Sequence, residues 1–292
     1  MTAPELVAEQ PCTVGEGPLW HPDEAALYWV DIPAGDLYRY DPSTEAHERV
    51  FTAEQAIGGY TIQRDGSLLL FEGGGAIQRW EAGNGIVETL YAGLDAERES
   101  RFNDVVADPA GRVFAGTMPT GDRLGRLYRL DRDGSLTVVD DGHDIPNGMD
   151  FSRDRSTMYL AVSDDFVIYA YDYDEETGEL TNRRPFVDTS DASGVPDGLT
   201  VDAADHVWCA RWDDHAVDRY TPAGDHDRRI EVPPPKASSI AFGGPEYEDL
   251  YVTTAIGEGA DADDHPEAGS VYRVRVGVTG VSEYRSTIGE GD

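Results

Sequence analysis

Lysine and cysteine are nearly absent from this chain of 292 residues. Lys236 is its only lysine, so almost all of its basic residues are arginines, and Cys12 and Cys209 are its two cysteines. Two cysteines are too few for a disulfide framework, and Cys209 lies in an apolar segment where we expect a buried structural thiol. No apolar run approaches the ~20 residues of a membrane-spanning helix, and the first residues do not resemble a signal peptide. We therefore expect a soluble, cytoplasmic protein that does not bind membranes.

Positive charge is also scarce. The chain has 57 acidic and 23 basic residues, which give a formal net charge of −34. So acidic a balance argues against binding to a nucleic-acid backbone or to an anionic membrane surface. Together with the scarcity of lysine, it suggests a halophilic protein of a salt-rich cytoplasm, because the Debye length falls to ~3 Å at 1 M salt and self-repulsion is then screened. We expect the fold to be lost after desalting, which circular dichroism can test.

Sustained helical periodicity is absent as well, and the chain has a repeat instead. A short polar or glycine-rich cluster occurs six times, and each copy is followed by three short apolar runs separated by turns. The clusters are Gly15–Trp20, Ile57–Thr61, Arg101–Val105, Ile145–Met149, Val195–Leu199 and Lys236–Ile240. Short strands that return every ~40–50 residues are typical of β-propeller blades. We predict an all-β fold, a six-bladed β-propeller with a central channel that forms a single domain over residues 1–292. A plain β-sandwich is the alternative, but six equivalent copies argue against it.

The place of the clusters in the repeat predicts where they lie in space. The first strand of each propeller blade lines the central channel, so the residues just before that strand surround one opening of the channel. Five polar residues share this place in the repeat, namely Glu16, Asn103, Asp104, Asn147 and Asp197. We therefore expect their side chains at one mouth of the channel.

Glu16, Asn147 and Asp197 are the residues best suited to hold a metal ion. Each is next to glycine or proline, which fix the backbone or let it approach closely. Two carboxylates and one amide oxygen are hard ligands that suit Ca²⁺, Mg²⁺ or Mn²⁺, with Zn²⁺ acceptable when waters complete its shell. Taken singly, Asn-Gly and Asp-Gly are also common turn dipeptides. Their shared place in the repeat favours a site for one divalent metal ion.

A second polar group, Arg101, Asn103 and Asp104, comes from the third repeat. At a channel mouth, Arg101 and Asn103 can donate hydrogen bonds to sugar hydroxyls or to a carbonyl oxygen. The alternative is that Arg101 and Asp104 pair with neighbouring blades. Lys236 is the first residue of the sixth cluster and could face the opening, although a solvated lysine after three prolines is the simpler interpretation. The seven histidines show no metal-ligand spacing.

At these residues the chain resembles the SMP-30/gluconolactonase/luciferin-regenerating-enzyme family, which includes regucalcin. The resemblance extends from about Cys12 to about Tyr284, and its strength lies in an ordered set of short motifs. The motifs are Glu16–Pro18, Arg101–Asp104, Gly116–Met118, Pro146–Gly148, Tyr171–Asp174 with Thr177–Gly178 and Asn182–Arg184, Pro196–Gly198, Phe242–Gly244, Tyr251–Thr253 and Pro266–Gly269.

The resemblance implies roles for particular residues. Glu16, Asn147 and Asp197 would hold one divalent metal ion, and Asp197 would also be the general base. Arg101 and Asn103 would match the family's substrate-holding pair. After Gly116–Met118, some relatives place a glutamate that touches the sugar. This chain has Asp122 in the corresponding loop, so Asp122 is the candidate for that contact and the sugar preference is open.

The activity implied is hydrolysis of a sugar lactone, such as gluconolactone or a pentonolactone (xylonolactone or arabinonolactone), to the aldonic acid. The metal would stabilise the oxyanion, Asp197 would accept a proton from water, and Arg101 and Asn103 would orient the ring. A bound cation lowers the pKa of Asp197 and weakens it as a base, unless the pKa of the water falls too. Two alternatives are a binding or scaffold propeller with a structural metal, and an esterase of the same architecture that acts on non-sugar esters. The expected partner is a small-molecule lactone, and the sequence leaves the oligomeric state and the native metal open.

Overall fold

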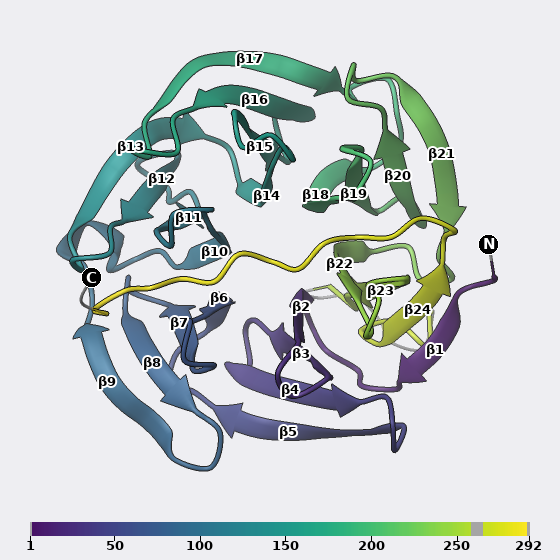
Figure 1. Cartoon of the computed structure of the whole chain (residues 1–292), viewed down its shortest axis with the longest axis horizontal. Coiled ribbons are helices and arrows are strands. Elements are labelled where there is room, and N and C mark those ends of the chain that lie inside the picture. The colour runs from purple at the N-terminus through teal and green to yellow at the C-terminus, as the bar shows by residue number, and fades with distance from the viewer. Residues whose placement is uncertain (1, 258–264, 291–292) are drawn as a thin grey trace.

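The chain folds into six antiparallel sheets arranged in a ring around a central channel (Figure 1). This computed structural model describes residues 2–257 and 265–290. Within these residues, the only helix is the single 3-10 turn η1 (Asp95–Glu97), and no helix is long enough or apolar enough to cross a membrane. The prediction of an all-β, six-bladed propeller is confirmed.

Each blade has four strands, and the first strand of each lies innermost. The first blade comprises β2 (Gly15–His21), β3 (Ala26–Asp31), β4 (Asp36–Asp41) and β5 (Ala46–Thr52). The second comprises β6 (Ile57–Ile62), β7 (Leu68–Glu72), β8 (Ile77–Glu81) and β9 (Gly85–Tyr91). The third comprises β10 (Phe102–Ala107), β11 (Val113–Thr117), β12 (Gly125–Leu130) and β13 (Leu136–His143). The fourth and fifth comprise β14 (Pro146–Phe151), β15 (Thr157–Val162), β16 (Val167–Tyr173) and β17 (Leu180–Asp188); and β18 (Val195–Val201), β19 (Val207–Trp212), β20 (Ala216–Tyr220) and β21 (His226–Glu231).

The sixth blade closes the ring by joining the two ends of the chain. Its inner strands are β22 (Ala237–Gly243), β23 (Asp249–Thr254) and β24 (Val271–Arg275), and its outer strand is β1 (Glu5–Ala8). β1 pairs antiparallel with β24, so that Glu5 lies opposite Arg273. The sequence repeat did not predict this exchange, because β1 precedes the first repeat and carries no motif of its own.

The core lies between neighbouring blades. Both faces of the second strand of a blade are covered, so β3, β7 and β11 are buried at every residue. Each is mainly apolar and has a polar residue only at its end. Aromatic rings interlock across these contacts. Phe71 and Phe102 meet edge to face with ring centroids 5.2 Å apart, and Trp208 and Phe242 meet in the same way at 6.0 Å. Such pairs add about 0.5–1.5 kcal/mol each beyond the burial of apolar area. Cys209 is fully buried in this core as a free thiol, as expected.

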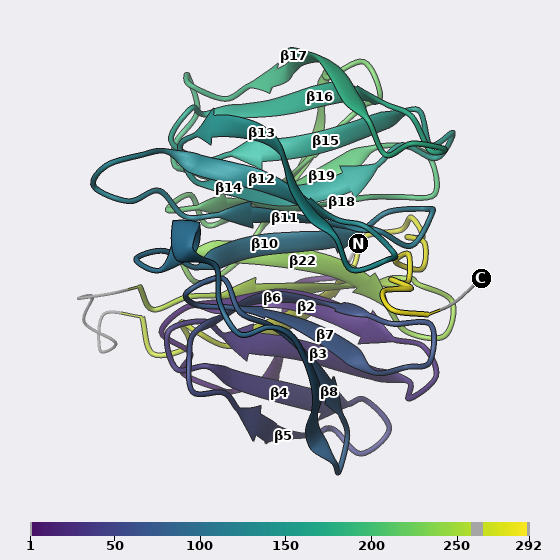
Figure 2. The same cartoon turned by 90° about the vertical axis from the view of Figure 1, so that its left-hand side faces the viewer.

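The C-terminal segment forms a strap, residues 277–290, that crosses one face of the ring and covers one end of the channel (Figures 1 and 2). Its backbone is hydrogen-bonded to four blades. These bonds are Ser286 N to Ile62 O (2.9 Å), Arg64 N to Ser286 O (2.9 Å), Thr287 N to Gly111 O (2.9 Å), Ala203 N to Thr279 O (3.0 Å) and Gly280 N to Tyr247 O (2.8 Å). Side chains reach the other two blades, since Arg285 pairs with Asp23 (2.7 Å) and the ring of Tyr284 packs against Phe151. The strap therefore contacts every blade of the propeller.

Candidate functional site

The end of the channel opposite the strap opens into a cavity of about 470 Å³. Glu16, Asn147 and Asp197, the three predicted metal ligands, all line it, as do Arg101 and Asn103. These residues come from the first, third, fourth and fifth blades. The structure thus gathers in one cavity five polar residues that are up to 181 positions apart in the chain (Asp197 against Glu16).

Local backbone geometry explains how these side chains reach the cavity. We expected the residues to precede the innermost strands, whereas Glu16, Asn147 and Asp197 lie inside β2, β14 and β18. Each of these strands has a register shift at this point, between Glu16 and Leu19 in the first case. A β-bulge re-aims a side chain that regular pleating would direct elsewhere. The segments that we expected to be turns before the innermost strands are therefore bulged parts of those strands.

Two positions beside the site require glycine because the innermost strands are closely packed around the channel. A Cβ atom at Gly148 would lie 2.1 Å from the backbone nitrogen of Leu199, and one at Gly198 would lie 2.0 Å from Ser239 Oγ. Both distances are far below van der Waals contact, so any larger residue would push neighbouring innermost strands apart. Asn147–Gly148 and Asp197–Gly198 resemble turn dipeptides, but the glycines serve close packing between blades.

A chain of hydrogen bonds fixes the amide groups of the site. Arg101 Nη1 donates to Asn103 Oδ1 (2.6 Å), and Asn103 Nδ2 donates to Asn147 Oδ1 (3.2 Å) and to the Pro146 carbonyl (3.0 Å). Asn147 Nδ2 donates to Ser163 Oγ (3.0 Å), which donates to the carbonyl of Pro196 (2.8 Å). Because its nitrogen is engaged by Ser163, Asn147 keeps its amide oxygen on the side of Asn103. Ser163 was not singled out from the sequence.

The two carboxyl groups of the site lie in an electrostatically unfavourable environment. Burial, together with the charges of Glu16 and Asp104, raises the pKa of Asp197 well above its ordinary value, and Arg101 opposes this rise. Burial and the charge of Asp104 raise the pKa of Glu16 to about 8. Asp197 Oδ1 is buried and has no hydrogen-bond partner. Two buried carboxyls, one with an orphaned oxygen, are ionised together only when a positive charge lies between them.

This donor set fits a hard divalent cation. Carboxylate and amide oxygens are the ligands that Ca²⁺, Mg²⁺ and Mn²⁺ prefer, and the orphaned Asp197 oxygen is one of them. Among the described residues, no three His, Cys, Asp or Glu side chains are arranged to hold a metal ion. The predicted triad has only two such residues, because its third member is the amide of Asn147.

The remaining predicted residues lie in different places. Asp122 is exposed in the loop between β11 and β12 and is not among the cavity-lining residues, whereas Met118 of the same loop is. Lys236 does not line the cavity either. Its ammonium lies 2.9 Å from Asp213 Oδ1 and its side chain is 20% exposed, so it is held rather than freely solvated. Trp212, which no sequence signal distinguished from the other tryptophans, does line the cavity.

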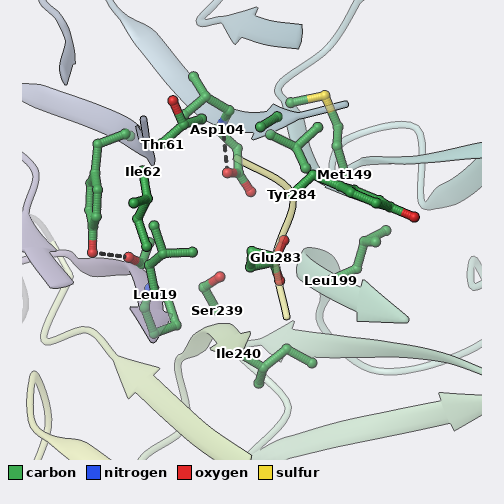
Figure 3. A pocket seen from close by; sticks show the side chains of 17 residues that line it. Leu19, Thr61, Ile62, Asp104, Met149, Leu199, Ser239, Ile240, Glu283 and Tyr284 are labelled. Atoms are coloured by element: carbon green, nitrogen blue, oxygen red, sulfur yellow. Dashed lines mark hydrogen bonds between the residues drawn. The ribbon is translucent and has the colours of Figure 1, made fainter. Parts of the chain in front are cut away.

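The prediction that Asp104 lies at the same mouth as Glu16 is wrong, because Asp104 faces the other end of the channel. It lines a second, smaller cavity of about 60 Å³ beneath the strap, together with Glu283 and Tyr284 (Figure 3). Figure 3 shows the carboxylates of Asp104 and Glu283 pointing into this cavity. Burial, then the charges of Asp150 and Asp104, raise the pKa of Glu283 well above its ordinary value. Glu283 lies outside the six repeats, so the repeat pattern could not find it.

Comparison with known proteins agrees with this architecture. The chain is 46% identical over 288 residues to pentonolactonase XacC of Haloferax volcanii, with 97% of each chain covered. It is 34% identical to regucalcin of Xenopus laevis, in an alignment that covers 95% of this chain and 96% of that protein. The crystal structure of the calcium-binding protein regucalcin from Agrobacterium tumefaciens superimposes with a TM-score of 0.89 at 27% identity, over 97% of both chains. Residues 14–256 match the family described as SMP-30/Gluconolactonase/LRE-like region. The chain therefore belongs to the SMP-30/gluconolactonase/LRE-like family.

Proposed function

We propose that this protein is a metal-dependent sugar lactonase, which hydrolyses a sugar lactone to the aldonic acid in the cavity at the open end of the channel. The observation that carries the proposal is the convergence of Glu16, Asn147 and Asp197 in one cavity, with a buried, unpartnered oxygen on Asp197. The similarity to a pentonolactonase favours a five-carbon sugar lactone as the substrate, with gluconolactone as the six-carbon alternative.

A divalent cation held by Glu16, Asn147 and Asp197 would supply Lewis-acid polarisation of a carbonyl oxygen. Beside that positive charge, Glu16 and Asp197 would both be ionised, so that Asp197 could accept a proton. Asp197 then accepts a proton from the water that attacks the lactone carbonyl carbon. The bond from this carbon to the ring oxygen breaks, and the ring oxygen leaves as a hydroxyl group after taking up a proton. The product is an open-chain aldonic acid.

Arg101 is our candidate for holding the substrate. Arg101 lines the cavity, and its guanidinium is oriented by Asn103, which accepts a hydrogen bond of 2.6 Å from it. Both N–H groups of the Asn103 amide are already used, on Asn147 and on the Pro146 carbonyl. We therefore assign Arg101 to the substrate's oxygen atoms, and Asn103 to the orientation of Arg101 and Asn147. Asp122, which is exposed, would reach the sugar only if its loop moved toward the cavity.

The test is a pH-indicator assay of ring opening, with xylonolactone, arabinonolactone, gluconolactone and an aryl ester as substrates. We expect the protein treated with a chelator to be inactive and to regain activity when Ca²⁺, Mg²⁺, Mn²⁺ or Zn²⁺ is added back singly. Preferential turnover of the aryl ester would support the alternative esterase. Full activity after chelation, with the ion shown to be removed, would contradict metal dependence. Loss of thermal stability without any lactone opening would favour a scaffold with a structural metal.

A further inference from the structure

Trp212 differs from the other tryptophans of the chain in its surroundings. Trp20, Trp29, Trp80 and Trp208 are core residues and at most 4% exposed. Trp212, the last residue of β19, is only half-buried and lines the same cavity as Glu16 and Asp197. A large aromatic side chain left partly uncovered beside polar catalytic groups is typical of ligand-binding pockets.

The backbone that carries Trp212 is fixed on two sides. Trp212 pairs with Val195, the first residue of β18, and Val195 also lines the cavity. A Cβ atom at Gly194 would lie 2.1 Å from the carbonyl oxygen of Trp212, so only glycine permits this close approach. The buried guanidinium of Arg211 donates to the carbonyls of Ser193 (3.0 Å) and Gly194 (3.2 Å). The ring therefore projects from a rigid part of the blade.

The only lysine of the chain holds the ring itself. Lys236 Nζ lies 5.6 Å from the centroid of the Trp212 ring and 2.9 Å from Asp213 Oδ1. A cation over an indole face is attracted by the ring quadrupole, by about 0.5–1 kcal/mol at exposed sites. Trp212 lines the cavity and Lys236 does not, so the lysine braces the ring from outside the space that a substrate would fill.

We propose that Trp212 is the platform on which the C–H face of the sugar ring stacks, with Lys236 and Asp213 as positioning residues that fix the indole ring. The inference rests on the proposed lactonase function. A sugar lactone presents hydroxyl and carbonyl oxygens at its edge, and its ring C–H bonds carry a small positive charge that suits the negative face of an aromatic ring. Trp212 comes from the fifth blade and Arg101 from the start of the third, so the two contact the ring from different walls of the cavity.

Intrinsic fluorescence tests this contact without any turnover. The probe is the lactam analogue of xylonolactone, in which nitrogen replaces the ring oxygen and hydrolysis is slow. We expect titration of the metal-loaded protein with the lactam to change the tryptophan emission, because Trp212 alone among the tryptophans faces the cavity. Trp212→Phe should abolish the change. A change that persists in Trp212→Phe would overturn the proposal, and so would the absence of any change in a wild-type protein that the lactam inhibits.

Steady-state kinetics then separate stacking from folding. Trp212→Ala should raise KM for the preferred lactone about tenfold while kcat changes less than threefold, and Trp212→Phe should restore KM to within threefold of the wild type. Lys236→Met, which keeps the length of the side chain and removes its charge, should raise KM by about twofold to fourfold. The matched control is Phe166→Ala, since Phe166 is an exposed aromatic on the turn between β15 and β16 and does not line the cavity.

Failure of this inference and failure of the proposed function give different results. An active wild type whose KM is unchanged in Trp212→Ala overturns the platform and leaves the lactonase intact. A wild type that opens no lactone, but whose emission responds to the lactam only when Trp212 is present, overturns the lactonase and supports a sugar-binding platform. Absence of both activity and response overturns both. A parallel fall of kcat and melting temperature in Trp212→Ala and Trp212→Phe would show a merely structural role.

Discussion

The two ends of the central channel contain the same chemical groups in opposite settings. At the open end, Glu16 and Asp197 line a cavity of about 470 Å³ that Arg101 also lines. At the strapped end, Asp104 and Glu283 line a cavity of about 60 Å³ under a segment that contacts every blade. The pKa values of Asp197 at the open end and Glu283 at the strapped end are both raised, because both carboxyls are buried and lie near other carboxylates.

The difference lies in how each pair can be neutralised. The cavity at the open end is large enough for a cation and a substrate, and Arg101 lines it. Asp197 Oδ1, which also belongs to this end, has no hydrogen-bond partner in the protein. At the closed end the cavity is small, burial raises the pKa of Asp104 to about 6, and burial with the charges of Asp150 and Asp104 raises the pKa of Glu283, so protons are enough to neutralise these carboxyls. We therefore expect a buried carboxyl pair to act in catalysis only where the fold leaves space beside it. The following experiments test this contrast.

Asp197→Asn should have the largest effect. The amide keeps the shape of the side chain but cannot accept a proton, so we expect kcat for the preferred lactone to fall by about 10³-fold, within the range of general-base catalysis. The pH-indicator assay at saturating metal measures this loss. Asp133→Asn, which removes an exposed carboxylate from a distant turn, is the matched control. Near-normal turnover in Asp197→Asn would remove Asp197 from the role of base.

Removal of the strap should mainly affect stability. A chain that ends after Val276 loses the backbone hydrogen bonds to Ile62, Arg64 and Gly111 and the cover of the closed end. We expect the strap to contribute several kcal/mol to the free energy of unfolding. Since each kcal/mol lost lowers the melting temperature by about 2–4 °C in chains of 150–250 residues, the melting temperature should fall by about 10 °C. Differential scanning calorimetry measures the change. A chain that ends after Glu290 serves as control, and an unchanged melting temperature would show that the ring needs no strap.

Glu283→Gln should have a smaller effect that depends on pH. The pKa of Glu283 is raised on folding, so its contribution to stability is complete below the ordinary value near 4.5 and is lost as the pH rises toward the raised value. The wild type should therefore lose stability as the pH rises from 5 to 8. The glutamine variant should be about 2–4 °C more stable than the wild type at pH 8 and little different at pH 5.

Thermal melts at both pH values, with the exposed Glu231→Gln as control, provide the measurement. An equal shift at pH 5 and pH 8 would mean that packing, rather than ionisation, distinguishes Glu283 from glutamine. The loss of structure at low salt, which the charge of −34 suggests, stays a separate prediction for circular dichroism.

Much of the site could be predicted because the repeat encodes it. Glu16, Asn147 and Asp197 occupy the same position in three of the six repeats. A closed ring brings equivalent positions together, whatever their distance along the chain. Residues outside the repeat pattern were not found in this way. Ser163 lies just after a second strand, Trp212 resembles any core tryptophan, and Glu283 belongs to the strap. Nothing in the local sequence of these three indicates what they contact.

The alternation of short apolar runs and turns was enough to specify the blades and their number. It also gathered Glu16, Asn147 and Asp197 at one mouth, but it placed Asp104 at the wrong end of the channel. Strand periodicity and repeat length are local properties, so they can be read along the chain. Tertiary packing alone settled that the ring is closed by β1 pairing with β24, that the other end is covered by the strap, and that Lys236 lies against Trp212 rather than in solvent. These features depend on segments that are distant in the chain and carry no shared pattern, so only the folded structure brings them together.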